Sequence, residues 1–282
     1  MSVAISAKDV KQLRDLTGAG MMDCKKALAE AEGDIEKAVE LLRKKGQKVS
    51  AKRADRDAKE GVVIAKTSGN RNNGIILRLS CETDFVAKND KFVAFANSIA
   101  DIALKNLPDS TEDLLALPYG EGMTVGEKIT EQIGVNGEKH ELSNYSKIIT
   151  AAGGGQVIPY IHMGHKAGVI VALNVEGPDI VEPGKNVAMQ VAAMRPIALN
   201  KDGVDATVIE KEIEIGKEQA RQEGKPEAML EKIAMGKLNK FYKERTLLNQ
   251  QYVKNGKMTV QAYLTSIHKD LTITDFKHVE LG

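Results

Sequence analysis

The chain has 282 residues, of which 42% are hydrophobic and 28% are charged, which predicts two or three globular domains. The formal net charge of +1 argues against a dedicated nucleic-acid-binding protein, and the lack of Trp, with only 4% aromatic residues, argues against stacking surfaces for single strands. Cys24 and Cys81, the two cysteines, lie far apart and outside any zinc-ligand spacing, which argues against a disulfide framework and fits a reducing cytosol.

The N-terminal residues 1–8 show no targeting signal, because no basic stretch is followed by an apolar one. No apolar run elsewhere approaches the roughly 20 residues that are needed to cross a bilayer. These two observations predict a cytoplasmic protein that does not contact a membrane.

Residues 1–46 are expected to form a domain of three short helices. Ser6 and Asp34 are residue types that cap helix N-termini, and each precedes a run with helical spacing of apolar side chains. Gly46 is expected to end the third helix. A unit of about 45 residues is close to the smallest that folds alone, so we interpret it as a docking module.

Residues 47–60 are predicted to be a basic linker. Between positions 43 and 59 eight positive residues oppose two acids, and no large apolar side chain occurs between Val49 and Val62. This pattern favours a solvated tether with some helix in it, and phosphate binding is the alternative.

Two related α+β subdomains are expected to follow, over residues 61–152 and 153–282. Each begins with two short apolar runs around a glycine-containing turn, as in a β-hairpin, and continues into a helical pattern. This recurrence indicates a duplicated α+β fold with small antiparallel sheets. The expected elements are strands at 62–65, 75–79, 146–152, 157–162, 169–175 and 272–280, and helices from 92, at 125–133, at 187–194 and at 259–268.

The run Gly153–Gly155 separates the two subdomains. It does not have the spacing of a phosphate-binding loop, and a strand rather than a helix follows it. We therefore interpret it as a flexible connection between strands.

Residues 206–244 differ from the rest because they are highly charged and form two helical patterns. Gly224 and Pro226 separate these patterns, since glycine tends to stop a helix and proline to start one. Apolar side chains at coiled-coil spacing on both sides predict an antiparallel helical hairpin that projects as an arm.

No set of residues predicts an enzyme. The five histidines form neither H-x-H nor H-E-x-x-H, and no nucleophile has a base near it in sequence. We expect no catalytic residue, no metal and no cofactor.

Two segments carry side chains that suit contact with a partner. Met21 and Met22 cannot both face inward on one helix, and methionine suits adaptable contact surfaces. Asp84 and Phe85 stand where an apolar strand ends and a helix begins, so a rigid frame could project them outward. The alternative is that Asp84 caps the next helix and Phe85 packs beneath it.

Two sequence motifs resemble those of a known family. Residues 17–28, TGAGMMDCKKAL, resemble the N-terminal signature of bacterial translation elongation factor Ts, and residues 81–89, CETDFVAKN, resemble its second signature. Residues 224–227 and 236–242 resemble its coiled-coil arm. The resemblance implies a ubiquitin-associated-like three-helix domain, then a core of two related α+β subdomains, the second of which carries a coiled-coil hairpin.

The resemblance also implies a function, that of guanine-nucleotide exchange factor for elongation factor Tu. The factor would bind this GTPase in its GDP-bound and nucleotide-free forms, would require no direct contact with nucleic acid, and could act as a monomer or a homodimer. It implies Mg²⁺ dislocation in the partner by Thr83, Asp84, Phe85 and Val86, and partner binding by Leu13, Met21, Met22 and His162.

Two rival interpretations use other features of the sequence. The three-helix domain and the basic linker would suit a docking protein for ubiquitin-like or RNA partners, and steep salt dependence of binding would favour that interpretation. The helical arm would suit a structural assembly protein, which stable self-association without exchange activity would favour.

Overall fold

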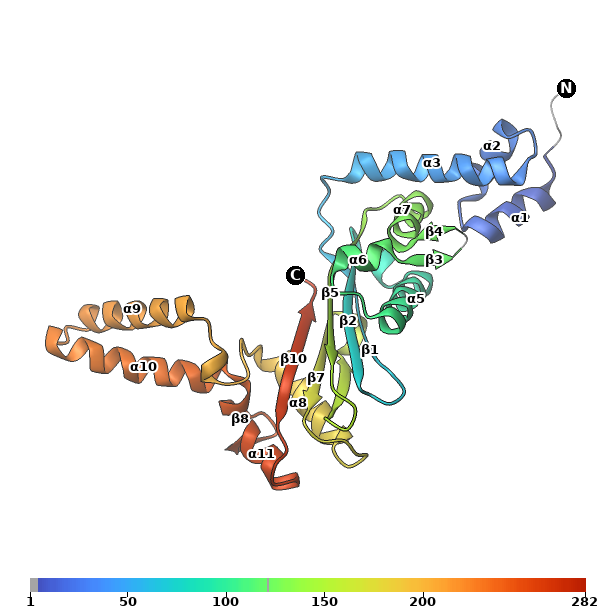
Figure 1. Ribbon diagram of the computed structural model, residues 1–282. Coiled ribbons are helices and arrows are strands. Elements are labelled where there is room, and N and C mark those ends of the chain that lie inside the picture. Colours follow the sequence, from blue (N-terminus) through green and yellow to red (C-terminus); the bar gives the residue numbers. More distant parts are fainter. Residues whose placement is uncertain (1–4, 121) are drawn as a thin grey trace.

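The computed structural model describes residues 5–120 and 122–282, so the first four residues of the segment searched for a targeting signal lie outside the described part. Figure 1 shows three parts: a helical domain at the N-terminus, a central pair of sheets, and a helical arm that projects away from the sheets. None of the helices in the described ranges combines the length and the apolar character that crossing a bilayer requires.

The N-terminal domain contains the three predicted helices. The Ser6 side chain accepts a hydrogen bond from the backbone N–H of Asp9, and the Asp9 side chain accepts one from the backbone of Ser6, which completes a capping box. Asp34 caps the third helix in the predicted way. The three helices enclose a small core around Leu13 and Leu28. They are α1 (Ala7–Thr17), α2 (Met21–Glu30) and α3 (Ile35–Arg53).

The prediction that Gly46 ends the third helix is wrong. Helix α3 runs through Gly46 to Arg53, so the first half of the predicted linker is helical. Gly46 is buried against α7 (Val125–Asn136), where a Cβ atom on Gly134 would lie 2.7 Å from the Gly46 Cα atom. Close packing of two helices therefore explains this glycine, and it also ties the end of the helical domain to the first subdomain.

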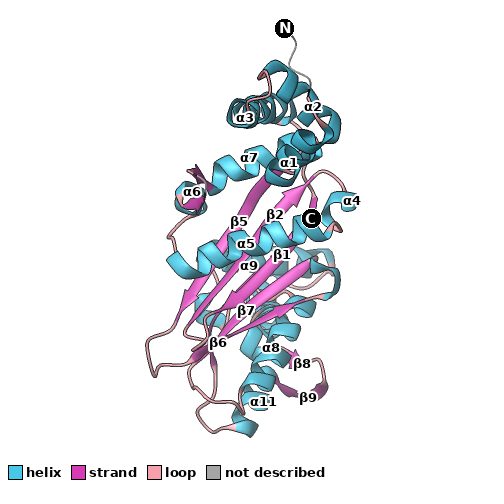
Figure 2. Ribbon diagram, turned by 90° about the vertical axis from the view of Figure 1, so that its right-hand side faces the viewer, coloured by secondary structure: helices cyan, strands magenta, loops and turns pink. Residues whose placement is uncertain are grey.

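The first subdomain is a three-stranded antiparallel sheet with helices on one face. Strand order is β1–β2–β5, and α5 lies across the sheet in Figure 2, with Phe92 and Ile99 in the shared core. Strand β5 begins at His140, earlier than the strand predicted at 146–152, because its first half carries polar side chains that hide the strand pattern. The elements are β1 (Glu60–Thr67), β2 (Asn73–Cys81), α4 (Asp84–Ala87), α5 (Asp90–Asn106), α6 (Thr111–Ala116), β3 (Pro118–Gly120), β4 (Met123–Thr124), α7 and β5 (His140–Ile149).

The second subdomain repeats this arrangement, as the sequence predicts. Its sheet has the order β10–β7–β6, and α8 and α11 cover its outer face. A short hairpin, β8–β9, precedes α11. The elements are β6 (Gln156–Ile161), β7 (Ala167–Leu173), α8 (Val181–Met194), β8 (Gln251–Tyr252), β9 (Asn255–Thr259), α11 (Val260–Ile267) and β10 (Ile273–Glu280).

The two sheets pack face to face and form the centre of the molecule. Val63 and Ile76 of the first sheet meet Ile170 of the second in one apolar cluster. The approach is close at Gly168, where a Cβ atom would lie 2.8 Å from both the Val63 Cγ1 and the Ile161 Cδ1 atoms. This packing brings the end of β2 and the β6–β7 turn to the same end of the molecule.

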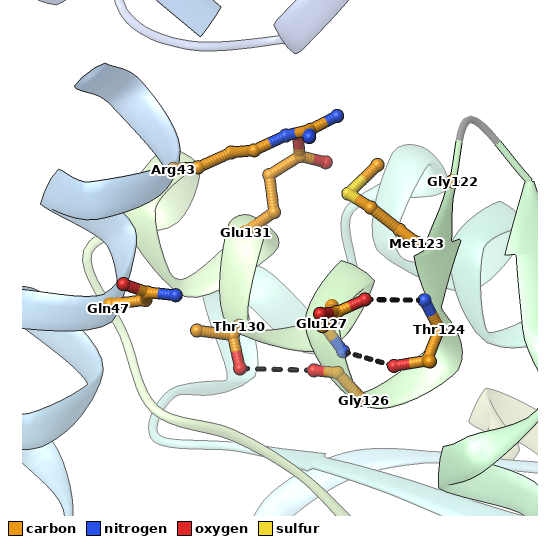
Figure 3. Close-up of a pocket in the computed structure, with 9 residues that line it drawn as sticks. All are labelled: Arg43, Gln47, Gly122, Met123, Thr124, Gly126, Glu127, Thr130 and Glu131. Atoms are coloured by element: carbon orange, nitrogen blue, oxygen red, sulfur yellow. Dashed lines mark hydrogen bonds between the residues drawn. The ribbon is translucent and has the colours of Figure 1, made fainter. Parts of the chain in front are cut away.

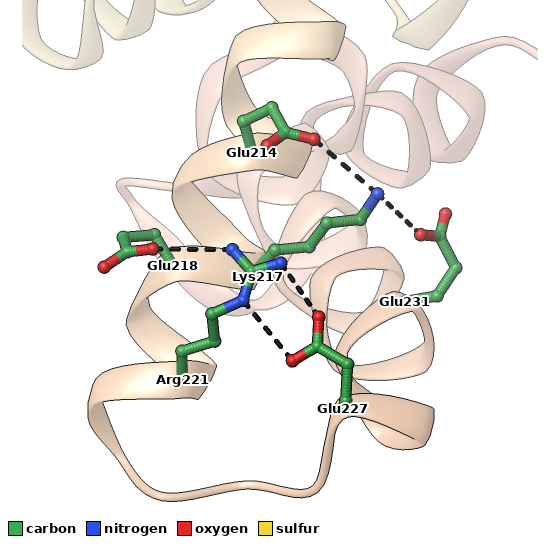
Figure 4. Close-up of polar contacts among 6 residues, drawn as sticks. All are labelled: Glu214, Lys217, Glu218, Arg221, Glu227 and Glu231. Carbon is green, nitrogen blue, oxygen red and sulfur yellow. Dashed lines mark hydrogen bonds and ion pairs between the residues drawn. The ribbon is translucent and has the colours of Figure 1, made fainter.

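The arm is the antiparallel helical hairpin that the sequence predicts. Helices α9 (Ala206–Gln222) and α10 (Leu230–Arg245) pack closely where Gly216 faces Ala234. Figure 4 shows the polar contacts that flank this seam: the Lys217 Nζ atom lies 2.7 Å from Glu231, and an Arg221 nitrogen lies 3.0 Å from Glu227. Exposed pairs of this kind contribute about 0–1 kcal/mol each, so the apolar seam supplies most of the stability.

Candidate partner-binding site

The Asp84–Phe85 turn exposes a large apolar side chain at one end of the sheets. Thr83 caps the four-residue helix α4, since its hydroxyl accepts a hydrogen bond from the Val86 backbone N–H. The Phe85 side chain is 85% exposed, which excludes the alternative that it packs beneath the following helix. Burial of a Phe side chain stabilises a fold by roughly 1.5–3 kcal/mol, and Phe85 does not make this contribution because it is exposed.

Side chains from distant segments hold the turn in place. Glu138, in the loop between α7 and β5, accepts hydrogen bonds from the Thr83 backbone N–H at 3.1 Å and from the Thr83 hydroxyl at 2.7 Å. Glu82 accepts hydrogen bonds from the Arg53 Nη1 atom at 2.8 Å and from the Lys139 backbone N–H at 2.6 Å. Burial acts to raise the pKa of Glu82, but these hydrogen bonds outweigh it and lower the pKa, so Glu82 is ionised near neutral pH.

Asp84 carries a negative charge next to the exposed ring. Its carboxylate lies 2.6 Å from the Lys88 Nζ atom, one helical turn further along the chain. The hydrogen bond from Lys88 lowers the pKa of Asp84, and the positive charge of Lys166 acts in the same direction. The turn therefore presents a carboxylate and an aromatic ring side by side at neutral pH.

The turn between β6 and β7 lies at the same end of the sheets and carries His162. The exposed His162 ring shares a 2.9 Å hydrogen bond with the Tyr160 hydroxyl through its Nδ1 atom. His165, which has a φ angle of +58°, fixes the turn through a 3.4 Å contact between its Nδ1 atom and the Val63 carbonyl.

Met163, beside His162, is 87% exposed, and the sequence patterns did not predict it as a site residue. A methionine next to a glycine in a short turn was the available signal.

The methionine pair forms a separate exposed surface on the N-terminal domain. Met21 and Met22 are 60% and 63% exposed and border a groove of about 660 Å³ between α1 and α2. Lys11 and Arg14 also border this groove. Leu13, which the resemblance groups with the two methionines, is fully buried instead, so in this conformation it supports the surface from below and does not reach it.

A cavity of about 440 Å³ lies where α3 crosses α7 (Figure 3). Part of its polar wall is engaged within the chain, because Thr124 and Glu127 form a capping box and the Thr130 hydroxyl donates to the Gly126 carbonyl at 3.0 Å. We attribute this cavity to the helix crossing and assign no ligand to it.

The cysteines and metal-binding residue types give no reactive centre in the described residues. Burial raises the pKa of the Cys24 thiol and raises that of Cys81 to about 12, so both remain protonated near neutral pH. Within residues 5–120 and 122–282, no three His, Cys, Asp or Glu side chains are grouped so that they could hold a metal ion.

His140 makes the stability of the first subdomain sensitive to acid. Burial lowers its pKa to about 4, although the charge of Glu82 opposes this shift. The unfolded chain binds this proton near pH 6.5, so stability is expected to fall by about 3 kcal/mol between pH 6.5 and pH 4. Urea unfolding at several pH values measures this loss, and His140→Gln, which does not titrate, should show a smaller one. Equal losses in the two proteins would contradict the assignment.

A rigid frame that projects a carboxylate and an exposed aromatic ring, with a separate docking domain, is typical of a protein that acts by contacting another protein. Residues 82–282 match the family model described as Elongation factor TS. The chain is 54% identical over 281 residues to Elongation factor Ts of Amoebophilus asiaticus, covering 99% of this chain and 100% of that protein. It is 51% identical to the Cytophaga hutchinsonii protein of the same name, with 99% of each chain covered. The chain belongs to the elongation factor Ts family, which confirms the resemblance seen in the sequence.

Proposed function

We propose that this chain is a guanine-nucleotide exchange factor for elongation factor Tu and that it works in the cytoplasm during translation elongation. Membership of the elongation factor Ts family supports the identity of the partner. The single observation that supports the mechanism is the 85% exposed Phe85 side chain on a turn held by Glu138 and Glu82. An exposed aromatic ring on a fixed frame can enter a partner with little loss of its own conformational entropy.

The proposed target of the turn is the Mg²⁺ site of the GTPase. A GTPase holds GDP through backbone amides of its phosphate loop and through Mg²⁺, which bridges phosphate and protein oxygens. Magnesium requires near-ideal octahedral geometry, so small displacements of its ligands are costly. Phe85 would separate elements beside the metal, and the ionised Asp84 would compete for nearby hydrogen bonds, so the metal and then GDP would leave.

Thermodynamic linkage sets the order of binding. A factor that weakens GDP binding is itself bound more weakly by the GDP form, and by the same ratio. The factor would therefore bind the nucleotide-free GTPase best and would leave when GTP enters. No covalent change in this chain is required.

The experiment that tests the proposal measures release of fluorescent GDP from elongation factor Tu, with and without the factor. Saturating factor should accelerate release in millimolar Mg²⁺, and the acceleration should shrink when the metal is chelated beforehand, because its displacement is then no longer required. Acceleration that is equal with and without Mg²⁺ would contradict action on the metal. No acceleration in either condition would contradict the exchange function.

His162 is expected to make a smaller contribution on the phosphate-loop side of the GTPase. His162→Ala should slow GDP release about fivefold, near the lower end of typical coupling between sites. The release rate at saturating factor measures this, and a rate equal to that of the unsubstituted protein would show that the ring has no role. His268→Ala, a substitution in the exposed segment after α11, serves as the control.

Met22 is expected to contribute to affinity rather than to the release step. Met22→Asp places a charge on the exposed α2 surface and should weaken binding to nucleotide-free elongation factor Tu by about 2 kcal/mol, or roughly 30-fold. Titration calorimetry measures the affinity. Met229→Asp, at a 47% exposed methionine near the arm tip, is the matched control. Similar losses in both variants would indicate a general effect of charge instead of a contact at α2.

A further inference from the structure

Two pairs of neighbouring residues, 82–83 and 138–139, exchange hydrogen bonds at the base of the exposed turn. Glu138 accepts from both hydrogen-bond donors of Thr83, the backbone N–H at 3.1 Å and the hydroxyl at 2.7 Å. In return, Glu82 accepts from the Lys139 backbone N–H at 2.6 Å. Each carboxylate thus holds the backbone of the other segment, 55 to 57 residues away in sequence.

The same network reaches the N-terminal domain through α3. Arg53, the last residue of α3, donates to both carboxylate oxygens of Glu82 at 2.8 Å, and the Glu82 side chain is only 15% exposed. Hydrogen bonds between ionised groups are shorter and stronger than neutral ones. The turn is therefore joined to α3 on one side and to the loop before β5 on the other.

Helix α4 needs such support because it is too short to be rigid by itself. It has four residues, and an isolated helix of this length is not stable in water. Its outward side chain, Phe85, gains almost no packing from the fold at 85% exposure. The direction in which Phe85 points is therefore set at its base, by the residues that hold Thr83.

We propose that Glu138 is a positioning residue for nucleotide exchange, which fixes the angle at which Phe85 enters the partner. This inference rests on the proposed function of the turn. Glu138 acts through Thr83, and both of its oxygens are already engaged within this chain. Its loss should let the turn rotate, so that binding persists while GDP release slows.

The test measures fluorescent-GDP release from elongation factor Tu over a range of factor concentrations, with Glu138→Ala in the full chain. We expect the maximal rate to fall about tenfold, while the half-saturating concentration changes less than twofold and the thermal midpoint stays near that of the unsubstituted protein. Glu138→Gln, which keeps one acceptor oxygen, should restore part of the rate, and it serves alone if the alanine variant does not fold. Glu141→Ala, at an exposed carboxylate three residues further on, should leave the rate unchanged.

A double-substitution cycle separates positioning from a general structural defect. In a Phe85→Ala background, Glu138→Ala should slow release no further, because the ring that it positions is gone. Faster hydrogen exchange of the Val86 and Ala87 amides in Glu138→Ala would support the same conclusion. A full maximal rate in Glu138→Ala, or equal losses with and without Phe85, overturns the positioning role alone. Undiminished release with Phe85→Ala overturns the proposed role of the turn, and the positioning role with it, whereas no acceleration by the unsubstituted factor overturns the exchange function itself.

Discussion

Replacement of Asp84 and Phe85 together by alanine is expected to slow factor-stimulated GDP release by about 100-fold, toward the upper end of typical coupling between two sites. The substitutions remove both the ring that would enter the GTPase and the carboxylate beside it. The double variant should still form a measurable complex, because the Met21–Met22 surface lies on a different domain. Release of fluorescent GDP at saturating factor gives the rate, and calorimetry gives the affinity.

The control for this double variant lies elsewhere on the same subdomain. Asp109 is paired with Lys147 at 2.6 Å, the same distance as the Asp84–Lys88 pair, so Asp109→Ala removes a comparable ion pair far along the chain from the turn. It should leave the release rate unchanged. A double variant that releases GDP at full speed would refute the mechanism, and a control that is equally slow would show that loss of charge, not of the turn, is responsible.

Local signals in the sequence predicted most of the helix starts correctly. Ser6 and Asp34 cap their helices as predicted, because capping depends on side chains within three residues of the helix start. The prediction that Gly46 ends the third helix failed because the reason for this glycine is not local. Its role depends on Gly134, 88 positions away, and a local pattern cannot distinguish a glycine that ends a helix from one that lets two helices touch.

The sequence also could not predict the direction in which the site side chains point. An acid next to an aromatic residue after a strand is compatible with a buried ring or a projecting one, and only the 85% exposure of Phe85 distinguishes them. Glu138 could not be selected, because no spacing rule connects a loop glutamate with a threonine 55 residues earlier. For Leu13, the resemblance implied a role in partner binding but did not indicate that the side chain is fully buried.

Gly155→Ala is expected to destabilise the chain by about 3–5 kcal/mol, because it combines a strained backbone with a close contact. Gly155 has a φ angle of +131°, and a Cβ atom there would lie 1.9 Å from the Leu173 carbonyl oxygen. Leu173 is the last residue of β7, which pairs with β6 directly after Gly155, so the sheet would have to separate. Within the glycine run, Gly155 is therefore a point of close backbone approach. The sequence suggested only a flexible connection there. Urea unfolding measures the loss.

Gly153→Ala is the control, since it places alanine at a positive φ angle without a close contact. Gly153 also has a positive φ angle, +74°, but no described atom lies within 4 Å of the position that a Cβ atom would take. Alanine there should cost about 1 kcal/mol, the usual penalty for a residue other than glycine in the left-handed region. The difference between the two variants then reports the approach of Gly155 to Leu173 together with the larger backbone strain at a φ angle of +131°. Equal losses would mean that conformation alone requires glycine at both positions, and that β6 can move away from β7 at little cost.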